Sequence, residues 1–255
     1  MRFLKRKWRS ITIILLSIIL VIPGIFYIYT LDYYRALPIA TETLNSDNVE
    51  NDIQNKMIVF RPQESASGKG IIFYPGGKVD YLAYAPLMEQ IAQEGYTCFL
   101  MKMSFNLAVF NQEAANKPIE KYKKIDSWYM SGHSLGGAMA SIYASKHQGQ
   151  IDGLILLGAY PAVDLSSSNM GMLSIYGSED LILSKDKVEK NRSYGPTDST
   201  YFEIKGGNHA YYGSYGNQKK DGKVIITDTE QQEITVREIV KFMKEDMEEH
   251  KKLEK

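Results

Sequence analysis

Short apolar runs alternate with segments of helical pattern along most of the chain, and this alternation limits the possible folds more than any other feature. The runs are compact and bounded by turn residues, as expected of strands; they fall at residues 57–60, 70–74, 97–101, 127–130, 153–157, 172–176 and 200–204, and the first of them is expected at the sheet edge. The pattern predicts an α/β domain over residues 56–255, with a mostly parallel, doubly wound sheet. An amphipathic closing helix is expected near the end, with Val236, Ile239, Val240, Met243 and Met247 on its apolar face.

The N-terminus has a different character. Residues 1–10 contain five basic residues and no acid, and Ile11 to Tyr29 follow with 19 residues that carry no charge. A helix of that length reaches about 28 Å, close to the thickness of the bilayer core. A cleaved signal peptide is the alternative, but its apolar region would be shorter and would end at small residues. We therefore expect a single-pass membrane anchor at 11–29, a cytoplasmic segment 1–10, a polar tether at 30–55 and an extracytoplasmic domain.

Charge and cysteine content exclude several classes of function. The formal net charge is zero, so the chain beyond residue 10 carries 25 basic against 30 acidic residues, which argues against a nucleic-acid partner. The single cysteine, Cys98, lies in an apolar run and is expected to be buried and inert. No CxxC motif or His/Cys cluster has the spacing of metal ligands, so neither a metal nor another cofactor is predicted.

The most specific motif is Gly-His-Ser-Leu-Gly at residues 132–136, which has the form G-x-S-x-G. It follows a predicted strand and precedes a helix rich in small residues, the setting of a nucleophile elbow. The glycines are needed because a side chain at 132 or 136 would clash where the helix folds back. Ser134 is therefore the predicted nucleophile; the alternative is a serine that merely caps the helix.

A serine hydroxyl needs a base, and the chain has four histidines. His133 is next to Ser134 and cannot turn back to its hydroxyl, and His147 lies roughly 20 Å along the predicted helix. His250 sits in the charged tail. His209 remains, in a loop just beyond the last predicted strand, where an α/β sheet presents its functional residues.

The base needs an acid to orient it, and in this arrangement the chain order is serine, acid, histidine. Asp180 is the first choice because it lies in a short turn after a predicted strand. Glu179 and Asp164 are the alternatives. For the oxyanion, the amide of Leu135 is expected to be one donor and that of Gly77 the second, with Lys78 close behind.

Tyrosines crowd the loop at 210–223 beside the predicted base. Tyr211 and Tyr212, together with His133, are candidate substrate contacts. The alternative is a surface loop that packs its own tyrosines.

The motifs at Phe73 to Val79 and Gly207 to Ala210, with the elbow, resemble the α/β-hydrolase superfamily over about residues 57–250. They are similar to bacterial, often membrane-anchored hydrolases related to the dienelactone-hydrolase-like branch. The resemblance implies a triad of Ser134, Asp180 and His209. Two features depart from the family: Pro75-Gly76-Gly77 stands where His-Gly is common, and residues 159–171 are too few for a lid domain.

The leading functional hypothesis is a serine hydrolase that cleaves a carboxylic ester or thioester through an acyl-serine intermediate. The substrate would be a small-molecule or lipid-like acyl compound. A peptidase or amidase, or an acyltransferase, would use the same triad. A catalytically silent fold used for binding is the alternative from another class.

Overall fold

The computed structural model describes residues 19–63, 66–183 and 185–253, and the chain divides into two units, Met1–Tyr33 and Tyr34–Lys255. In the first unit, residues 19–31 are helical. No helix within the described ranges is both long and apolar enough to cross a bilayer. The predicted cytoplasmic segment 1–10 and the start of the predicted anchor at 11–29 lie outside those ranges.

The second unit is built on an eight-stranded sheet with the order β1-β2-β4-β3-β5-β6-β7-β8. The first two strands pair antiparallel, β2 is antiparallel to β4, and all other neighbours are parallel. The strands are β1 (Glu50–Gln54), β2 (Met57–Arg61), β3 (Lys69–Tyr74), β4 (Thr97–Met101), β5 (Ser127–His133), β6 (Gly153–Leu157), β7 (Gly171–Gly177) and β8 (Ser199–Ile204). The predicted mostly parallel α/β sheet is confirmed.

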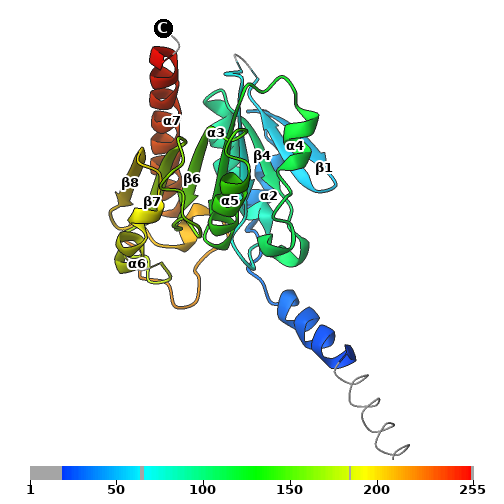
Figure 1. Ribbon diagram of the computed structural model, residues 1–255. Helices are drawn as coiled ribbons and strands as arrows, with labels where there is room; N and C mark the ends of the chain where they lie inside the picture. Colours follow the sequence, from blue (N-terminus) through cyan, green and yellow to red (C-terminus); the bar gives the residue numbers. More distant parts are fainter. Residues whose placement is uncertain (1–18, 64–65, 184, 254–255) are drawn as a thin grey trace, which may run out of the picture. The chain divides into compact units, whose positions relative to one another are not determined.

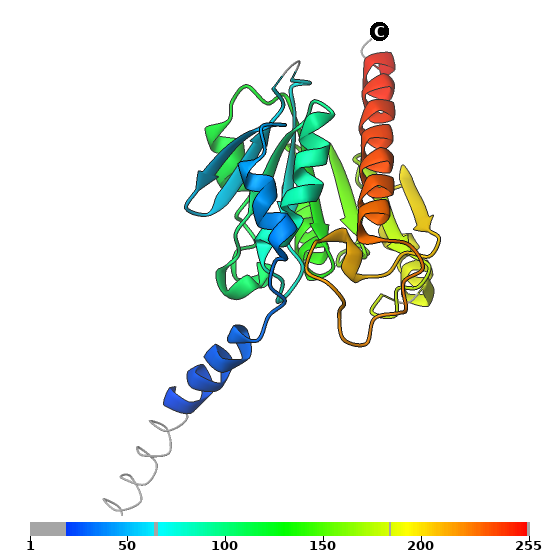
Figure 2. The ribbon, with the colours of Figure 1, turned by 180° about the vertical axis from the view of Figure 1, so that it is seen from behind.

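Helices cover both faces of the sheet (Figure 1, Figure 2). Helix α5 (Leu135–Lys146) lies over one face, in front of the strands in Figure 1, and α3 (Ala85–Gln93) and α7 (Asp228–Leu253) lie over the other, in front in Figure 2. Shorter helices are α2 (Pro38–Glu42), α4 (Asn116–Lys121) and α6 (Lys185–Lys190). Because the inner strands β4 and β6 are buried on both faces, they are largely apolar rather than alternating, whereas the edge strand β8 is partly exposed and more polar.

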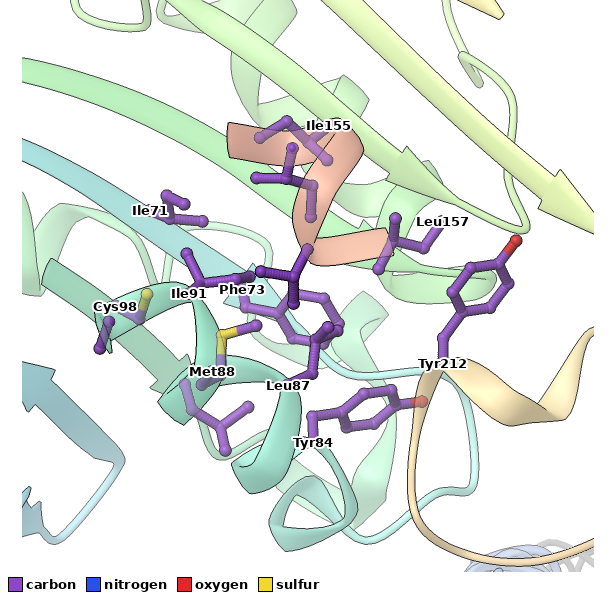
Figure 3. Packing of buried hydrophobic residues seen from close by; sticks show 14 of the residues in the cluster. Ile71, Phe73, Tyr84, Leu87, Met88, Ile91, Cys98, Ile155, Leu157 and Tyr212 are labelled. Carbon is purple, nitrogen blue, oxygen red and sulfur yellow. The ribbon is translucent and has the colours of Figure 1, made fainter. Parts of the chain in front are cut away.

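Each face has its own core cluster. On the side of α3 and α7, alternate strand residues pack with one face of α3; Figure 3 labels Ile71, Phe73, Leu87, Met88 and Ile91 among them. On the side of α5, strand residues of the opposite parity pack with the small residues of that helix. Cys98 lies in the first cluster, fully buried, and burial raises the pKa of its thiol, as expected of an inert cysteine.

The chain before the first predicted strand differs from the prediction. The sequence predicts an irregular tether at 30–55, but this segment contains α2 and β1. Residues 57–60 are predicted at the sheet edge, but the strand that they form, β2, lies between β1 and β4, and β1 is the edge strand. The sequence of β1, Glu-Asn-Asp-Ile-Gln, is polar because an edge strand with partly exposed side chains needs no apolar face.

Candidate active site

Ser134 sits in a sharp turn between β5 and α5. Its φ and ψ are 51° and −120°, an unfavourable conformation for a residue with a Cβ, of the kind that gathers at functional positions. The side chain makes no capping hydrogen bond with the helix. Its own amide donates to the Leu157 carbonyl at 2.9 Å, which ties the turn to β6. The helix-cap interpretation of Ser134 therefore has no support in the geometry.

The elbow glycines are required by close backbone approach. A Cβ on Gly132 would lie 2.5 Å from the carbonyl carbon of Gly136, as predicted for a helix that folds back on its strand. A Cβ on Gly136 would overlap the carbonyl oxygens of Tyr74 and Pro75. Gly136 thus packs against the end of β3, and the elbow is in direct contact with the loop after β3.

His209 and Asp180 form a buried pair. Nδ1 of His209 and Oδ2 of Asp180 are 2.7 Å apart, and both side chains are almost fully removed from solvent. The other carboxylate oxygen of Asp180 accepts the amides of Ile182 at 2.9 Å and Leu183 at 2.6 Å, so the carboxylate is held in one orientation. A histidine that donates from Nδ1 to a carboxylate keeps the lone pair on Nε2. That Nε2 is buried and has no hydrogen-bond partner among the described residues.

The alternative acids lie elsewhere. Glu179 accepts a hydrogen bond from the hydroxyl of Ser178, and Asp164 is exposed and accepts the amide of Ser166. The structure thus brings Asp180, and neither alternative, to His209.

Two of the histidines that the sequence analysis excluded, His147 and His250, do not contribute to this pair in the described structure. His147 pairs with Glu113, with 2.9 Å between Nε2 and the carboxylate. The side chain of His250 lies outside the described set, as does that of Met247, the last residue of the predicted apolar face.

A cavity of about 340 Å³ contains both Ser134 and His209. The rest of its wall is mostly apolar, with the cation of Lys187 and the phenol of Tyr160; the other lining residues are Leu135, Ala138, Gly158, Ala159, Ala162, Ile182 and Leu183. The cavity can hold an apolar group next to the serine hydroxyl.

The loop after β3 offers few free amides. The amide of Gly76 donates to the hydroxyl of Tyr84 at 3.1 Å, and that of Lys78 donates to the Asn106 carbonyl at 2.8 Å. Among the described residues the amide of Gly77 has no acceptor, and Leu135, as the first residue of α5, has none within its helix. A Cβ on Gly77 would lie 2.8 Å from Cδ2 of Leu135, so these two candidate donors are neighbours.

The structure places the three predicted substrate contacts outside the cavity that contains the serine. Tyr212 is buried, its hydroxyl donates to the Ile175 carbonyl at 3.2 Å, and it lies with core residues in Figure 3. His133 is also buried, and Tyr211 donates through its hydroxyl to Asn217. The position of Tyr212 follows from its chemistry, because a buried phenol needs an acceptor and finds one in the adjacent strand.

Two residues that help to position His209 were not predicted from the sequence. Gln231, fully buried on α7, accepts the Asn208 amide at 3.0 Å and donates to the Asn208 carbonyl at 2.9 Å, which fixes the residue before His209. Gly158 has a φ of 51°, and a Cβ there would lie 3.0 Å from Nδ1 of His209. A polar residue on the buried side of an amphipathic helix is the signal that could have identified Gln231.

Comparisons with known proteins agree with this architecture. A sequence model of the alpha/beta hydrolase family matches residues 70–233, and the chain belongs to this family. A dienelactone hydrolase from Anabaena variabilis ATCC 29413 superposes with a TM-score of 0.58 at 12% identity, covering 74% of this chain and 96% of that one. A predicted CIB-like hydrolase from Thermoplasma acidophilum gives 0.50 at 16% identity, covering 76% and 98%. None of the curated proteins matches the sequence.

The elbow packing leads to a first prediction. Gly136→Ala should destabilise the domain by more than about 2 kcal/mol, because the new methyl group meets two backbone carbonyls that cannot move independently. Gly149→Ala is the matched control, since nothing lies within 4 Å of a Cβ there. Urea unfolding of both variants measures the difference, and equal midpoints would contradict the packing described.

The buried histidine leads to a second prediction. Burial, together with electrostatic repulsion from His209, lowers the pKa of His133 well below its usual range, while the backbone of His209 acts in the opposite sense. Below about pH 6.5 the unfolded chain therefore binds a proton that the folded chain does not, and stability falls as pH falls. This group should contribute up to about 1.4 kcal/mol per pH unit.

The measurement is the free energy of unfolding at about pH 7.5 and about pH 5.5, on either side of the unfolded pKa, for the parent and for His133→Gln. The variant should lose less stability on acidification than the parent. An identical loss would mean that His133 takes up its proton as easily in the fold as in the unfolded chain.

Proposed function

We propose that this hydrolase-family chain is a serine hydrolase that cleaves a carboxylic ester or thioester. The observation that carries the proposal is Nε2 of His209: it has no hydrogen-bond partner among the described residues, and His209 shares a cavity with Ser134 while Asp180 holds the opposite nitrogen. A base with a free lone pair beside a serine is the arrangement that acyl transfer requires.

The chemistry follows from these positions. The hydroxyl oxygen of Ser134 attacks the substrate carbonyl carbon, and its proton passes to Nε2 of His209. The oxyanion accepts hydrogen bonds from the amides of Gly77 and Leu135. As the carbonyl re-forms, the alcohol or thiol leaves with the proton from His209. Asp180 keeps the other proton on Nδ1 and stabilises the imidazolium.

The second half of the reaction releases the acid. A water molecule gives its proton to Nε2 of His209 and attacks the acyl carbon. The new tetrahedral intermediate then expels the oxygen of Ser134, which recovers its proton from His209. The same base therefore serves twice, and the enzyme returns to its starting state.

The cavity is open toward the acyl group of the substrate. Its wall is largely apolar, and the connection between β6 and β7 comprises residues 158–170 without a helix, so it contributes no covering domain. An open, apolar cavity of about 340 Å³ suits the part of an acyl chain next to the carbonyl, while the rest of a longer chain and the leaving group extend beyond it.

A fluorophosphonate probe tests the activated serine. The full chain in detergent should label, and Ser134→Ala and His209→Ala should both lose labelling by at least about 100-fold, because removing nucleophile or base removes the reaction. Ser167→Ala and His147→Ala are the matched controls and should label like the parent. A folded parent that does not label would favour the binding protein, and turnover of amides over esters would favour the peptidase.

We propose in addition that residues 11–29 anchor the chain in the membrane, with the hydrolase domain outside. The support is the uncharged length of this run and the five basic residues before it. The full chain should remain with membranes after an alkaline carbonate wash, because such a wash removes peripheral proteins but not spanning helices. Protease added to intact cells should remove the domain; a spared domain would place it in the cytoplasm.

A further inference from the structure

The loop after β4 exposes aromatic side chains to solvent. Residues 104–111, which we call the aromatic loop, contain Phe105, Val109 and Phe110, which are 48%, 40% and 50% exposed. The rings of Phe105 and Phe110 contact each other edge to face, with centroids 5.6 Å apart. Large apolar groups gathered on a surface mark a site of interaction with a partner or a membrane.

The backbone of this loop is strained. Phe105 and Asn106 both have positive φ, at 58° and 54°, which side chains with a Cβ seldom adopt. Two such residues in succession are held by the surrounding structure, and strain of this kind gathers at functional segments. Here it maintains a conformation in which nearly half of a phenylalanine remains exposed.

The aromatic loop lies against the candidate active site. The Asn106 carbonyl accepts the amide of Lys78, and the side chain of Leu107 lies 3.7 Å from the position of a Cβ on Gly77. A Cβ on Gly77 would also meet Leu135, which lines the cavity with the serine. The aromatic loop therefore packs on the same short turn that borders the cavity wall.

Basic side chains lie beside the loop. Val109 and Phe110 border a groove of about 640 Å³. Its charged lining residues are Lys56, Lys102, Lys117 and Lys146, against Glu113 and Glu120. Glu113 already pairs with Lys146 at 3.3 Å. The groove thus has a net positive charge next to exposed aromatic rings, the combination that binds an anionic lipid surface.

The folded domain begins at the same place. The amide of Tyr34 donates to the Lys78 carbonyl, and the amide of Asp80 donates to the Tyr34 carbonyl, both at 2.8 Å. Tyr29, the end of the uncharged run, precedes Tyr34 by a stretch of chain that can span at most about 18 Å. If that run lies in a bilayer, the turn that includes Gly77 cannot lie far from the bilayer surface.

Other loops at this edge of the sheet also expose apolar groups. Leu181, after β7, is exposed, and so is Ile225, whose amide donates to the Gly206 carbonyl beyond β8. The carboxyl ends of the parallel strands therefore carry the cavity, the aromatic loop and the first residue of the domain together.

We propose that the aromatic loop, with Lys56 and Lys102 beside the end of β4, docks into the headgroup region of an anionic bilayer, and that acyl esters of membrane lipids reach Ser134 from that surface. The proposal rests on the hydrolase activity and the anchor proposed above. The occupant is a lipid surface because the aromatic rings, Lys102 directly after β4 and the start of the domain share one edge of the sheet.

Site-directed fluorescence tests the docking. Phe105→Cys, labelled with an environment-sensitive fluorophore, is compared with Gln148→Cys, an exposed position just beyond the far end of α5; Cys98 is buried and should not react. The full chain is reconstituted in phosphatidylglycerol vesicles that contain spin-labelled lipid. The label at 105 should be quenched at least about twofold, and the label at 148 should not, because only the former would lie among headgroups. Equal signals at the two positions would overturn the proposal.

Kinetics provide the second readout. The double variant Phe105→Ser, Phe110→Ser should hydrolyse a long-chain fluorogenic ester embedded in vesicles about tenfold more slowly than the parent, because it loses apolar contact with the bilayer. It should hydrolyse a water-soluble short-chain ester at the parent's rate. Tyr194→Ser, which replaces an exposed aromatic residue between α6 and β8, is the matched control. An equal loss on both substrates would overturn docking and indicate damage to the active site.

The same measurements separate failure of docking from failure of its premises. A parent that does not float with vesicles in a density gradient would overturn the anchor, and docking with it. A parent that floats but does not hydrolyse the soluble ester would overturn the hydrolase, and the delivery of lipid esters with it. A parent that floats and hydrolyses the soluble ester, with an unquenched label at 105, would overturn docking alone.

Discussion

The contact between Gly136 and the end of β3 is the constraint on which the rest of the site depends. A helix that starts directly after Ser134 must pass over the loop of the neighbouring strand, and here it does so at a separation that excludes even a methyl group. This approach places the first turn of α5 beside Gly77. Ser134 and the candidate oxyanion donors are therefore arranged by backbone packing of the turn after β3 against β5 and α5, which fixes a site more closely than a freely moving loop would.

The side of the cavity that His209 lines is held differently, by hydrogen bonds between side chains and the backbone. Asp180 accepts two amides of its own loop, and Gln231 reaches from α7 to bind both backbone groups of Asn208. The closing helix also buries Ile239 and Met243 in the core cluster on its side of the sheet. The position of His209 therefore depends on how the C-terminal helix packs, although none of the candidate catalytic groups lies on that helix.

Much of this arrangement could be predicted from the sequence, because its main signals are local. The elbow at Ser134 and the position of His209 both follow from turn residues that directly succeed apolar runs. The supporting contacts could not be predicted, because they join residues far apart in the chain: Gln231 is 23 positions from Asn208, and nothing local to either shows that they meet. The structure of the expected tether was missed for another reason, since β1 is a strand by its pairing with β2 and not by its polar composition.

Buried polar groups at the elbow connect the loop after β3 with β5 and bring β5 into contact with His209. The hydroxyl of Tyr84 accepts the Gly76 amide at 3.1 Å and lies 2.7 Å from Nδ1 of His133, so it can donate its proton to that nitrogen. The ring of His133 in turn lies 4.6 Å from that of His209, centroid to centroid. Burying a phenol is unfavourable unless its hydroxyl is satisfied, and here Nδ1 of His133 satisfies it. The loop after β3 cannot shift relative to the strand that leads to Ser134 without breaking these bonds, so they add positional order to the site that apolar contacts alone would not supply.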